Sequence, residues 1–397
     1  MAGFLFRNLC GRFRQSARID RRLSPRPRCD FVRYVNGTGG HNPRVSAQTD
    51  VSAAKKPSIR VTLVEGDGPG PAVCAAVRKI LKAAKVPIEW DRQTVRVRRD
   101  PITDRMAVNA ELLQSAADTR VVLRGPATAP ADDGSPVSTA LTLHKALRAS
   151  IGVQLFASVE GHCPFGYLSM VNVRDNVSAE YSEIEHLVTP GVVQSIKTVT
   201  RRQSEELARF AFDYAVAHGH RRVTTLHKAN VMRMSDGTFL KACRRVKCDY
   251  PGLEYNEERL DKFCLQVVNE PCQYDVLLTP SLYGAIAGAA VSAMAGGPAT
   301  VPYAAFGPDV AVFGTMYDGP AVCRNGVIAK PVINPTGLIR SATWMLQHLG
   351  MPEIRLRIEK ALDETIRQGV KTGDMDGVAS CEQFTNAIVK NVARQER

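Results

Sequence analysis

Residues 59–71 have the sequence IRVTLVEGDGPGP, in which a β-branched apolar run ends in a turn rich in glycine and proline. Residues 72–85 follow with apolar side chains at spacings of three and four, the pattern of an amphipathic helix. A strand, a glycine turn and a helix in this order open an α/β protein. The alternation recurs, with strands predicted at residues 120–123, 223–226 and 274–278 and helices at residues 203–218, 338–349 and 353–368. The predicted fold class is α/β.

The composition is that of a globular protein. The chain has 397 residues, of which 44% are hydrophobic and 23% charged. These values exclude a disordered, collagen-like or small disulfide-stapled chain for the bulk of the sequence. The length is sufficient for one large or two ordinary domains. The ten cysteines are scattered without a CxxC pair, which disfavours zinc sites and disulfide frameworks. We therefore expect buried free thiols.

The N-terminal segment holds most of the excess positive charge. Residues 1–44 carry ten arginines, no lysine and two aspartates, a net of +8 against +13 for the whole chain. Apolar residues such as Phe4, Leu5 and Phe6 form a stripe between the arginines, which is typical of a mitochondrial transit peptide. The alternative is a basic tail that contacts RNA or anionic lipid, although RNA binding does not need an apolar stripe. We expect a transit peptide over residues 1–44, a linker over 45–57, and a location in the mitochondrial matrix.

One segment has the length of a membrane span. Residues 276–307 contain no charged side chain, which is enough in principle to cross a bilayer. The segment also contains three prolines, and its apolar residues are mostly alanine and not leucine or isoleucine. Small side chains provide little free energy for insertion. The sequence therefore predicts a small-residue helix buried in a globular core, and no transmembrane segment.

Three motifs carry polar residues that chemistry could use. Residues 66–70, GDGPG, partly match a dinucleotide-binding fingerprint but lack its G-x-G-x-x-G spacing, so a tight turn is the simpler interpretation. Residues 171–186, VNVRDNVSAEYSEIEH, place an arginine, acids and a tyrosine after a strand. These residues could bind an anion and supply a phenolic acid. The alternative, an edge strand with solvated charges, is favoured when this motif is taken alone.

The third motif covers residues 226–237, LHKANVMRMSDG. It places Lys228 at the carboxyl end of a predicted strand, which is where ligands bind in α/β sheets. The dipeptide Asp236-Gly237 indicates a turn or the end of a helix.

Together, the order and spacing of these motifs resemble the isocitrate/isopropylmalate dehydrogenase family, the metal-dependent β-decarboxylating dehydrogenases. Within the family, the chain resembles subunits of the mitochondrial NAD-dependent isocitrate dehydrogenase. The resemblance extends from about residue 58 to the C-terminus. It rests on GDGPGP at 66–71, RGP at 124–126, EYSEIEH at 180–186, GVVQSIKTVT at 191–200, HKANVMRMSDG at 227–237, PSLYG at 280–284 and NPTG at 334–337.

This resemblance implies two α/β domains around one discontinuous sheet. The larger domain is expected to contain residues 58–157 and 297–397, and the smaller one residues 158–296. Residues 181–200 are expected to form a hairpin arm that clasps the neighbouring subunit.

The resemblance also implies an activity, in which NAD oxidises a 2-hydroxy acid that then loses carbon dioxide with the help of Mg²⁺ or Mn²⁺. In this family the active site is shared between two subunits. The lysine of HKAN and an aspartate that follows it serve the neighbouring subunit. The matching residues here are Ser138 and Arg174 for substrate, Tyr181 and Lys228 for catalysis, Asp261 for the metal and Asn334 for the adenine of NAD.

Other positions depart from the family pattern. His144 and Gln154 replace two substrate arginines, Ala285 and Ala289 replace two metal aspartates, Ala140 replaces an asparagine, and Tyr317 lies near the position of a nucleotide-loop histidine. These losses predict that the chain's own site is inactive, and they argue against binding of NAD or metal by this chain alone.

Because Lys228 and Asp261 are retained, the sequence favours a non-catalytic or regulatory subunit that completes a partner's site. The expected partner is a catalytic NAD-isocitrate dehydrogenase subunit, with isocitrate or citrate as candidate ligands and neither nucleic acid nor membrane as a partner. The alternative is a pseudoenzyme that acts as a structural or binding protein.

Overall fold

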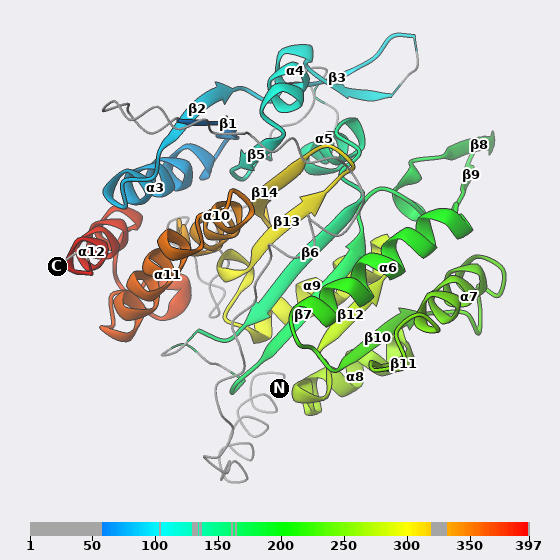
Figure 1. Cartoon of the computed structure of the whole chain (residues 1–397). Helices are drawn as coiled ribbons and strands as arrows, with labels where there is room; N and C mark the ends of the chain where they lie inside the picture. The colour runs from blue at the N-terminus through cyan, green and yellow to red at the C-terminus, as the bar shows by residue number, and fades with distance from the viewer. Residues whose placement is uncertain are drawn as a thin grey trace, which may run out of the picture.

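A single mixed sheet runs through the molecule (Figure 1). The computed structural model describes residues 58–102, 105–128, 134, 137–159, 162, 165–318 and 332–395. The strand order in the sheet is β11-β10-β12-β7-β6-β13-β14-β5-β1-β2. The bounds are β1 Ile59–Val64, β2 Ile88–Gln93, β5 Val121–Arg124, β6 Ile151–Ala157, β7 Ser169–Asp175, β10 Arg222–His227, β11 Glu254–Arg259, β12 Val276–Thr279, β13 Pro302–Phe306 and β14 Ala311–Thr315. Two hairpins stand apart from this sheet, β3 (Val97–Arg99) with β4 (Met106–Val108), and β8 (Glu185–Thr189) with β9 (Val192–Ser195).

Strand pairing is parallel in both wings of the sheet and antiparallel in its middle. Strands β11, β10, β12 and β7 pair in parallel, so their carboxyl ends meet at one edge. Strand β6 pairs antiparallel with both β7 and β13, and β13 pairs antiparallel with β14. Because β7 lies between β12 and β6, the edge-strand interpretation of residues 171–186 is wrong. The charges that end this motif follow a central strand.

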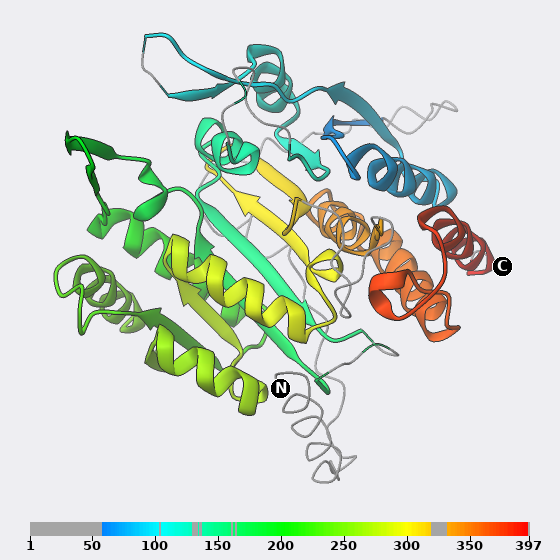
Figure 2. The ribbon, with the colours of Figure 1, turned by 180° about the vertical axis from the view of Figure 1, so that it is seen from behind.

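Helices cover both faces of the sheet. One face is covered by α3, α6, α7, α10, α11 and α12 (Figure 1), and the other by α8 and α9 over one wing (Figure 2) and by α4 and α5 over the other. The helix bounds are α3 Gly70–Ala83, α4 Ala110–Thr119, α5 Thr139–Ala146, α6 Arg201–Ala217, α7 Ser235–Lys247, α8 Leu260–Asn269, α9 Ser281–Met294, α10 Thr336–His348, α11 Pro352–Arg367 and α12 Cys381–Arg394.

The strands are apolar on both faces because both faces are covered. In β12, Val276 and Leu278 belong to the cluster under α6, whereas Leu277 between them belongs to the cluster under α8 and α9. In β1, Leu63 and Val64 divide between the two faces in the same way. Successive residues of a strand point to opposite faces, so short continuous apolar runs such as IRVTLV become central strands. The predicted α/β class is confirmed.

The glycine-rich turn at residues 66–70 makes a close backbone approach. Gly66 and Gly68 have φ angles of +73° and +54°, and a Cβ atom on Gly66 would lie 1.8 Å from the carbonyl oxygen of Pro126. The Asp67 amide donates to that same oxygen over 3.0 Å. The prediction of a tight turn is therefore confirmed, and its role is to pack the start of α3 against the loop after β5.

The uncharged segment at residues 276–307 forms β12, α9 and β13. Helix α9 buries one face, but Leu282 and Ile286 on its other face are exposed, so the prediction of a fully buried helix is wrong for that face. Among the described helices, none has the length and apolar character needed to cross a membrane.

The sheet is hydrogen-bonded across its whole width, without the discontinuity that the resemblance implied. The predicted boundary at residues 157 and 158 falls just after β6, which pairs with β7 over seven residue pairs. The division into residues 58–157 with 297–397 and residues 158–296 stays a prediction.

The predicted transit peptide and linker lie outside the described residues. Of the described cysteines, Cys74 and Cys243 are buried, while three others are exposed, so the expectation of buried thiols holds only in part.

Candidate functional site

Lys228 and Asp261 form an ion pair at the carboxyl edge of the sheet. Strands β10 and β11 are in parallel register, with His227 opposite Arg259, so the residues that follow the two strands lie side by side. The Lys228 Nζ atom lies 3.1 Å from Asp261 Oδ1, and both side chains remain accessible to solvent. The hydrogen bond from Lys228 lowers the pKa of Asp261 below its ordinary value. The two residues that the resemblance assigns to a neighbouring subunit's site therefore lie together at the surface.

Arg174 and Tyr181 form a second pair. Arg174 lies near the carboxyl end of β7, and Tyr181 lies in the 3₁₀ turn Glu180–Ser182. The guanidinium carbon of Arg174 lies 5.7 Å from the centre of the Tyr181 ring, within the range of a cation–π contact. The Nε atom of Arg174 is buried and has no hydrogen-bond partner among the described residues. The structure thus brings together one predicted substrate residue and one predicted catalytic residue.

Polar residues form a transverse row across the middle of the sheet. Strand register aligns Arg124 of β5 with Gly314, Gly314 with Tyr303 of β13, Tyr303 with Gln154 of β6, and Gln154 with Asn172 of β7. Asn172 Nδ2 donates to Gln154 Oε1 over 2.9 Å, and Thr279 Oγ1 donates to Asn172 Oδ1 over 2.8 Å. Gln154 is therefore part of a buried hydrogen-bond network. Its side chain is buried and uncharged, so it does not replace the charged donors of an arginine that would clamp a carboxylate.

His144 cannot supply the charge of the arginine it replaces. It is buried on α5, with Nε2 3.4 Å from the hydroxyl oxygen of Tyr303. Burial, together with the positive charges of Arg124 and Arg174, lowers the pKa of His144 to about 3. The imidazole is consequently neutral at physiological pH and has no ionic attraction for a carboxylate.

The residues present do not fit the metal ion of the family. Ala285 and Ala289 lie one turn apart on α9, at the positions of the two missing aspartates, and their methyl groups provide no ligand. The third metal residue, Asp261, is expected to serve a neighbouring subunit and is here paired with Lys228. Within one chain, the described residues contain no cluster of three His, Cys, Asp or Glu side chains that could hold a metal. The described residues of this chain therefore do not provide a ligand set for the metal ion of the family.

Helix α9 lies directly on β7, close to Arg174. A Cβ atom on Gly284 would lie 2.3 Å from Thr279 Oγ1 and 2.8 Å from Arg174 Cβ, two atoms held close to the backbone of their strands. Asn172 Nδ2 also donates to the Gly284 carbonyl oxygen over 3.0 Å. Glycine at position 284 thus permits the close packing that covers the polar row.

Gly284→Ala is expected to reduce the free energy of unfolding by about 1–3 kcal/mol, because the new methyl group displaces α9 from β7. The matched control is Gly237→Ala on α7, where a Cβ atom would meet nothing within 4 Å. That substitution is expected to stabilise the helix by up to about 1 kcal/mol. Denaturant unfolding of both variants tests this difference, and equal stability would contradict the close packing of α9.

Ser138 and Asn334 serve local structure. Ser138 caps α5, with its Oγ accepting from the Leu141 amide over 3.3 Å. Asn334 is buried before α10, where Oδ1 accepts from the Thr336 amide over 2.9 Å and Nδ2 donates to Asp374 over 2.7 Å. The structure engages neither side chain with the other predicted site residues. The Asn334 contacts give no support for NAD binding, and residues 319–331, in the expected nucleotide loop, lie outside the described residues.

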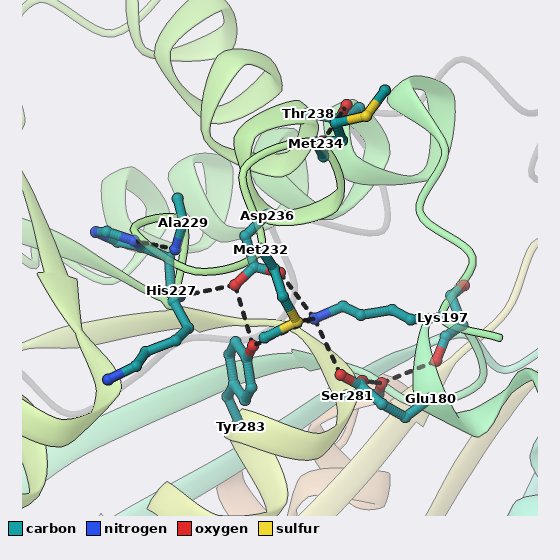
Figure 3. Close-up of polar contacts among 12 residues, drawn as sticks. Glu180, Lys197, His227, Ala229, Met232, Met234, Asp236, Thr238, Ser281 and Tyr283 are labelled. Carbon is teal, nitrogen blue, oxygen red and sulfur yellow. Dashed lines mark hydrogen bonds and ion pairs between the residues drawn. The ribbon is translucent and has the colours of Figure 1, made fainter. Parts of the chain in front are cut away.

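Two groups of residues near the site escape prediction from the sequence. Arg124 is fully buried, and its guanidinium donates to Asp318 Oδ1 over 2.6 Å. The RGP motif contains this arginine, but its burial depends on strand register. Asp236 lies in the first turn of α7 and is almost wholly buried, so the interpretation of Asp236-Gly237 as a turn or helix end is wrong. Asp236 bonds Lys197 and the backbone of Lys228 (Figure 3). The polar character of the motif was a signal, but the pairing with Lys197 is not visible in the sequence.

A ten-stranded mixed sheet with ligand-binding residue types at its carboxyl edge is the architecture of an α/β dehydrogenase. Residues 60–388 match the isocitrate/isopropylmalate dehydrogenase family, and the chain belongs to that family. It is 39% identical over 335 residues to the alpha subunit of mitochondrial NAD isocitrate dehydrogenase from Macaca fascicularis, covering 84% of this chain and 95% of that protein. It is 37% identical over 340 residues to a regulatory subunit of mitochondrial NAD isocitrate dehydrogenase from Dictyostelium discoideum, covering 84% and 92%. The crystal structure of isocitrate dehydrogenase from Methylococcus capsulatus superposes with a TM-score of 0.75 at 31% identity, covering 84% of this chain and 99% of that one.

Proposed function

We propose that this protein is a non-catalytic or regulatory subunit of a mitochondrial NAD-dependent isocitrate dehydrogenase, which converts isocitrate to 2-oxoglutarate in the tricarboxylic acid cycle. The observation that carries the proposal is a contrast between two places in the same chain. The region around the polar row lacks the arginines and metal aspartates that the resemblance implies there, whereas Lys228 and Asp261 remain paired 3.1 Å apart at the surface. These are the residues that the chain would supply to a partner's site.

Exposed apolar surface supports assembly with such a partner. The β8–β9 hairpin carries Leu187, Val188, Val192 and Val193, all exposed. An isolated two-stranded hairpin is marginal in water without further contacts, and clustered exposed apolar residues are typical of a protein interface. The hairpin corresponds to the expected clasp at residues 181–200.

In this proposal each retained residue has one task at the partner's site. The Lys228 amine takes part in proton transfer to or from the reacting substrate. The Asp261 carboxylate completes the oxygen ligands of the partner's Mg²⁺ or Mn²⁺, hard cations that prefer such ligands. Oxidation and decarboxylation take place on the substrate, NAD and metal that the catalytic subunit binds. Isocitrate or citrate is the candidate ligand for any effector role of the chain's own pocket.

Coexpression with a catalytic NAD-isocitrate dehydrogenase subunit tests the proposal. The two chains are expected to copurify, and the complex is expected to form NADH from isocitrate faster than the catalytic chain by itself. A chain that fails to copurify, or that copurifies without changing the activity, contradicts a role in completing the partner's site. The second result would favour a pseudoenzyme with a structural role.

Asp261→Ala is expected to raise the metal concentration needed for half-maximal activity of the complex, because it removes a carboxylate ligand from the partner's cation. The control is Asp249→Ala. Asp249 is a similarly exposed carboxylate that pairs with Arg209. Titration with Mn²⁺ at saturating isocitrate measures the shift. Identical titration curves for the two variants would show that Asp261 does not reach the metal.

Deletion of residues 1–44 is expected to leave the protein in the cytosol, because it removes ten arginines and the apolar stripe between them. The mitochondrial location named for its relatives supports import. Microscopy and cell fractionation of tagged full-length and truncated chains measure the difference, with import into the matrix expected for the full-length chain. Mitochondrial location of the truncated chain would remove the argument for a transit peptide.

A further inference from the structure

Lys197 is the centre of a buried polar network at the base of the clasp hairpin (Figure 3). Its Nζ atom lies 2.7 Å from Asp236 Oδ1, 2.9 Å from Glu180 Oε1 and 3.3 Å from the Tyr283 hydroxyl. The lysine side chain is only 13% exposed. One amine therefore joins the segment before Tyr181, the first turn of α7 and the first turn of α9.

Asp236 uses both of its carboxylate oxygens. Oδ1 accepts from Lys197, whereas Oδ2 accepts from the backbone amide of Lys228 over 2.7 Å and from the Tyr283 hydroxyl over 3.1 Å. The carboxylate is 1% exposed. The backbone of Lys228 is thereby tied to a buried anion, at the point where the chain leaves β10.

A buried carboxylate requires a counter-charge, since an unpaired buried charge is strongly unfavourable. Burial alone would lower the pKa of Lys197, but its hydrogen bonds to Asp236 and Glu180 outweigh burial and raise the pKa. Lys197 is therefore protonated at physiological pH. The Lys197 ammonium lies against one oxygen of the Asp236 carboxylate, and the other oxygen accepts from the Lys228 amide. Amide hydrogen bonds to a charged acceptor are stronger than those to a neutral one.

The loop that carries Lys228 also contacts the network through Met232, whose Sδ atom lies 3.8 Å from Lys197 Nζ and 3.7 Å from the Tyr283 hydroxyl. Val231 and Met234, in the same loop, expose 66% and 87% of their surface. The amides of Val231 and Met232 both donate to the Lys228 carbonyl, which holds the turn together internally and does not attach it to the sheet. Lys228 directly follows β10, and the hydrogen bond from its amide to Asp236 fixes the direction in which the chain leaves the strand, and with it the start of the Lys228 side chain.

We propose that Lys197 and Asp236 are a positioning pair that sets Lys228, and with it the ion pair to Asp261, for the neighbouring subunit's site. This inference rests on the proposed function. Neither residue is required to touch substrate. Because the pair acts only by positioning, its loss is expected to affect turnover through Lys228 alone. Misplacement of a reacting group by about 1 Å can reduce a rate by about 10²-fold.

The test is a double-mutant cycle in the complex with a catalytic subunit, using Asp236→Ala, Lys228→Ala and the two combined. Asp236→Ala leaves Lys197 paired with Glu180, so it does not strand a buried charge. It is expected to lower turnover at the completed site by about 10–10²-fold, while the combined variant is expected to equal Lys228→Ala. Asp236→Asn, which keeps an oxygen for the Lys228 amide, is expected to lose less than Asp236→Ala.

Two controls separate positioning from general destabilisation. Arg355→Met with Glu359→Gln removes a comparably buried ion pair on α11 and is expected to leave turnover unchanged. Copurification and thermal melting check assembly. If Asp236→Ala fails to assemble, Lys197→Met with Asp236→Asn removes both charges at once. It is expected to give a smaller loss than Asp236→Ala, because the asparagine keeps an oxygen for the Lys228 amide, and this loss is again expected to be absent in the Lys228→Ala background.

The outcomes distinguish the inference from the proposed function. The positioning inference is wrong, and the proposed function stands, if Lys228→Ala lowers turnover but loss of the pair does not. The same conclusion follows if loss of the pair lowers turnover equally with and without Lys228. If Lys228→Ala itself has no effect, the proposed function is wrong and the inference falls with it.

Discussion

Lys228→Ala is expected to lower the rate at the site that this chain completes by about 10²–10⁴-fold, the usual loss when a group that transfers or stabilises a proton is removed. The amine lies at the carboxyl end of β10, beside Asp261, and is partly exposed. Sites completed by other subunits keep their own lysine, so the loss observed for the whole complex is partial. Steady-state NADH formation at saturating isocitrate and metal measures it.

The complex is expected to remain assembled, because the substitution removes no apolar surface from the clasp hairpin or from α9. Lys241→Ala is the matched control, since Lys241 is an exposed lysine on the neighbouring helix α7. Size-exclusion chromatography of both variants separates a catalytic loss from dissociation. An unchanged rate in an intact complex would leave this chain a structural or allosteric subunit only.

The alternation of elements was predictable because each strand is a short apolar run bounded by turn residues. The predicted ends of β1, β10 and β12 lie within two residues of those observed. Residues that follow parallel strands share one edge of the sheet, so the position of Lys228 also followed from the sequence. The likeness to the family then identified the aspartate with which Lys228 pairs.

Contacts between distant segments could not be predicted in this way. The alignment of Arg124, Tyr303 and Gln154 depends on the register of β5, β14, β13 and β6, which no local pattern specifies. The pairing of Lys197 with Asp236 joins residues 39 positions apart. Asp236 followed by glycine has the local character of a turn, yet tertiary contacts place it in the first turn of a helix.

The second large effect concerns the chain's own pocket. The purified chain alone is expected to form no NADH from isocitrate. Each charged hydrogen bond to a substrate carboxylate contributes about 1.5–3 kcal/mol, so loss of two arginine clamps weakens binding by about 10²–10⁴-fold. His144, with its pKa of about 3, and Gln154, committed to Asn172, do not replace these clamps. Robust turnover by the unmodified chain would contradict this conclusion.

Ala285→Asp combined with Ala289→Asp separates the loss of metal from the loss of substrate binding. The two positions lie four residues apart on α9 and therefore share a face of the helix, so the new carboxylates can bind one cation together. Mn²⁺ binding, measured by calorimetry, is expected to strengthen, whereas the asparagine pair Ala285→Asn with Ala289→Asn, of matched size but without charge, is expected to bind weakly. NADH formation is expected to stay absent in both, because His144 and Gln154 are unchanged. If turnover returns with the aspartates, the missing metal ligands alone keep this pocket inactive, and the closed polar row beneath α9 is no barrier to substrate.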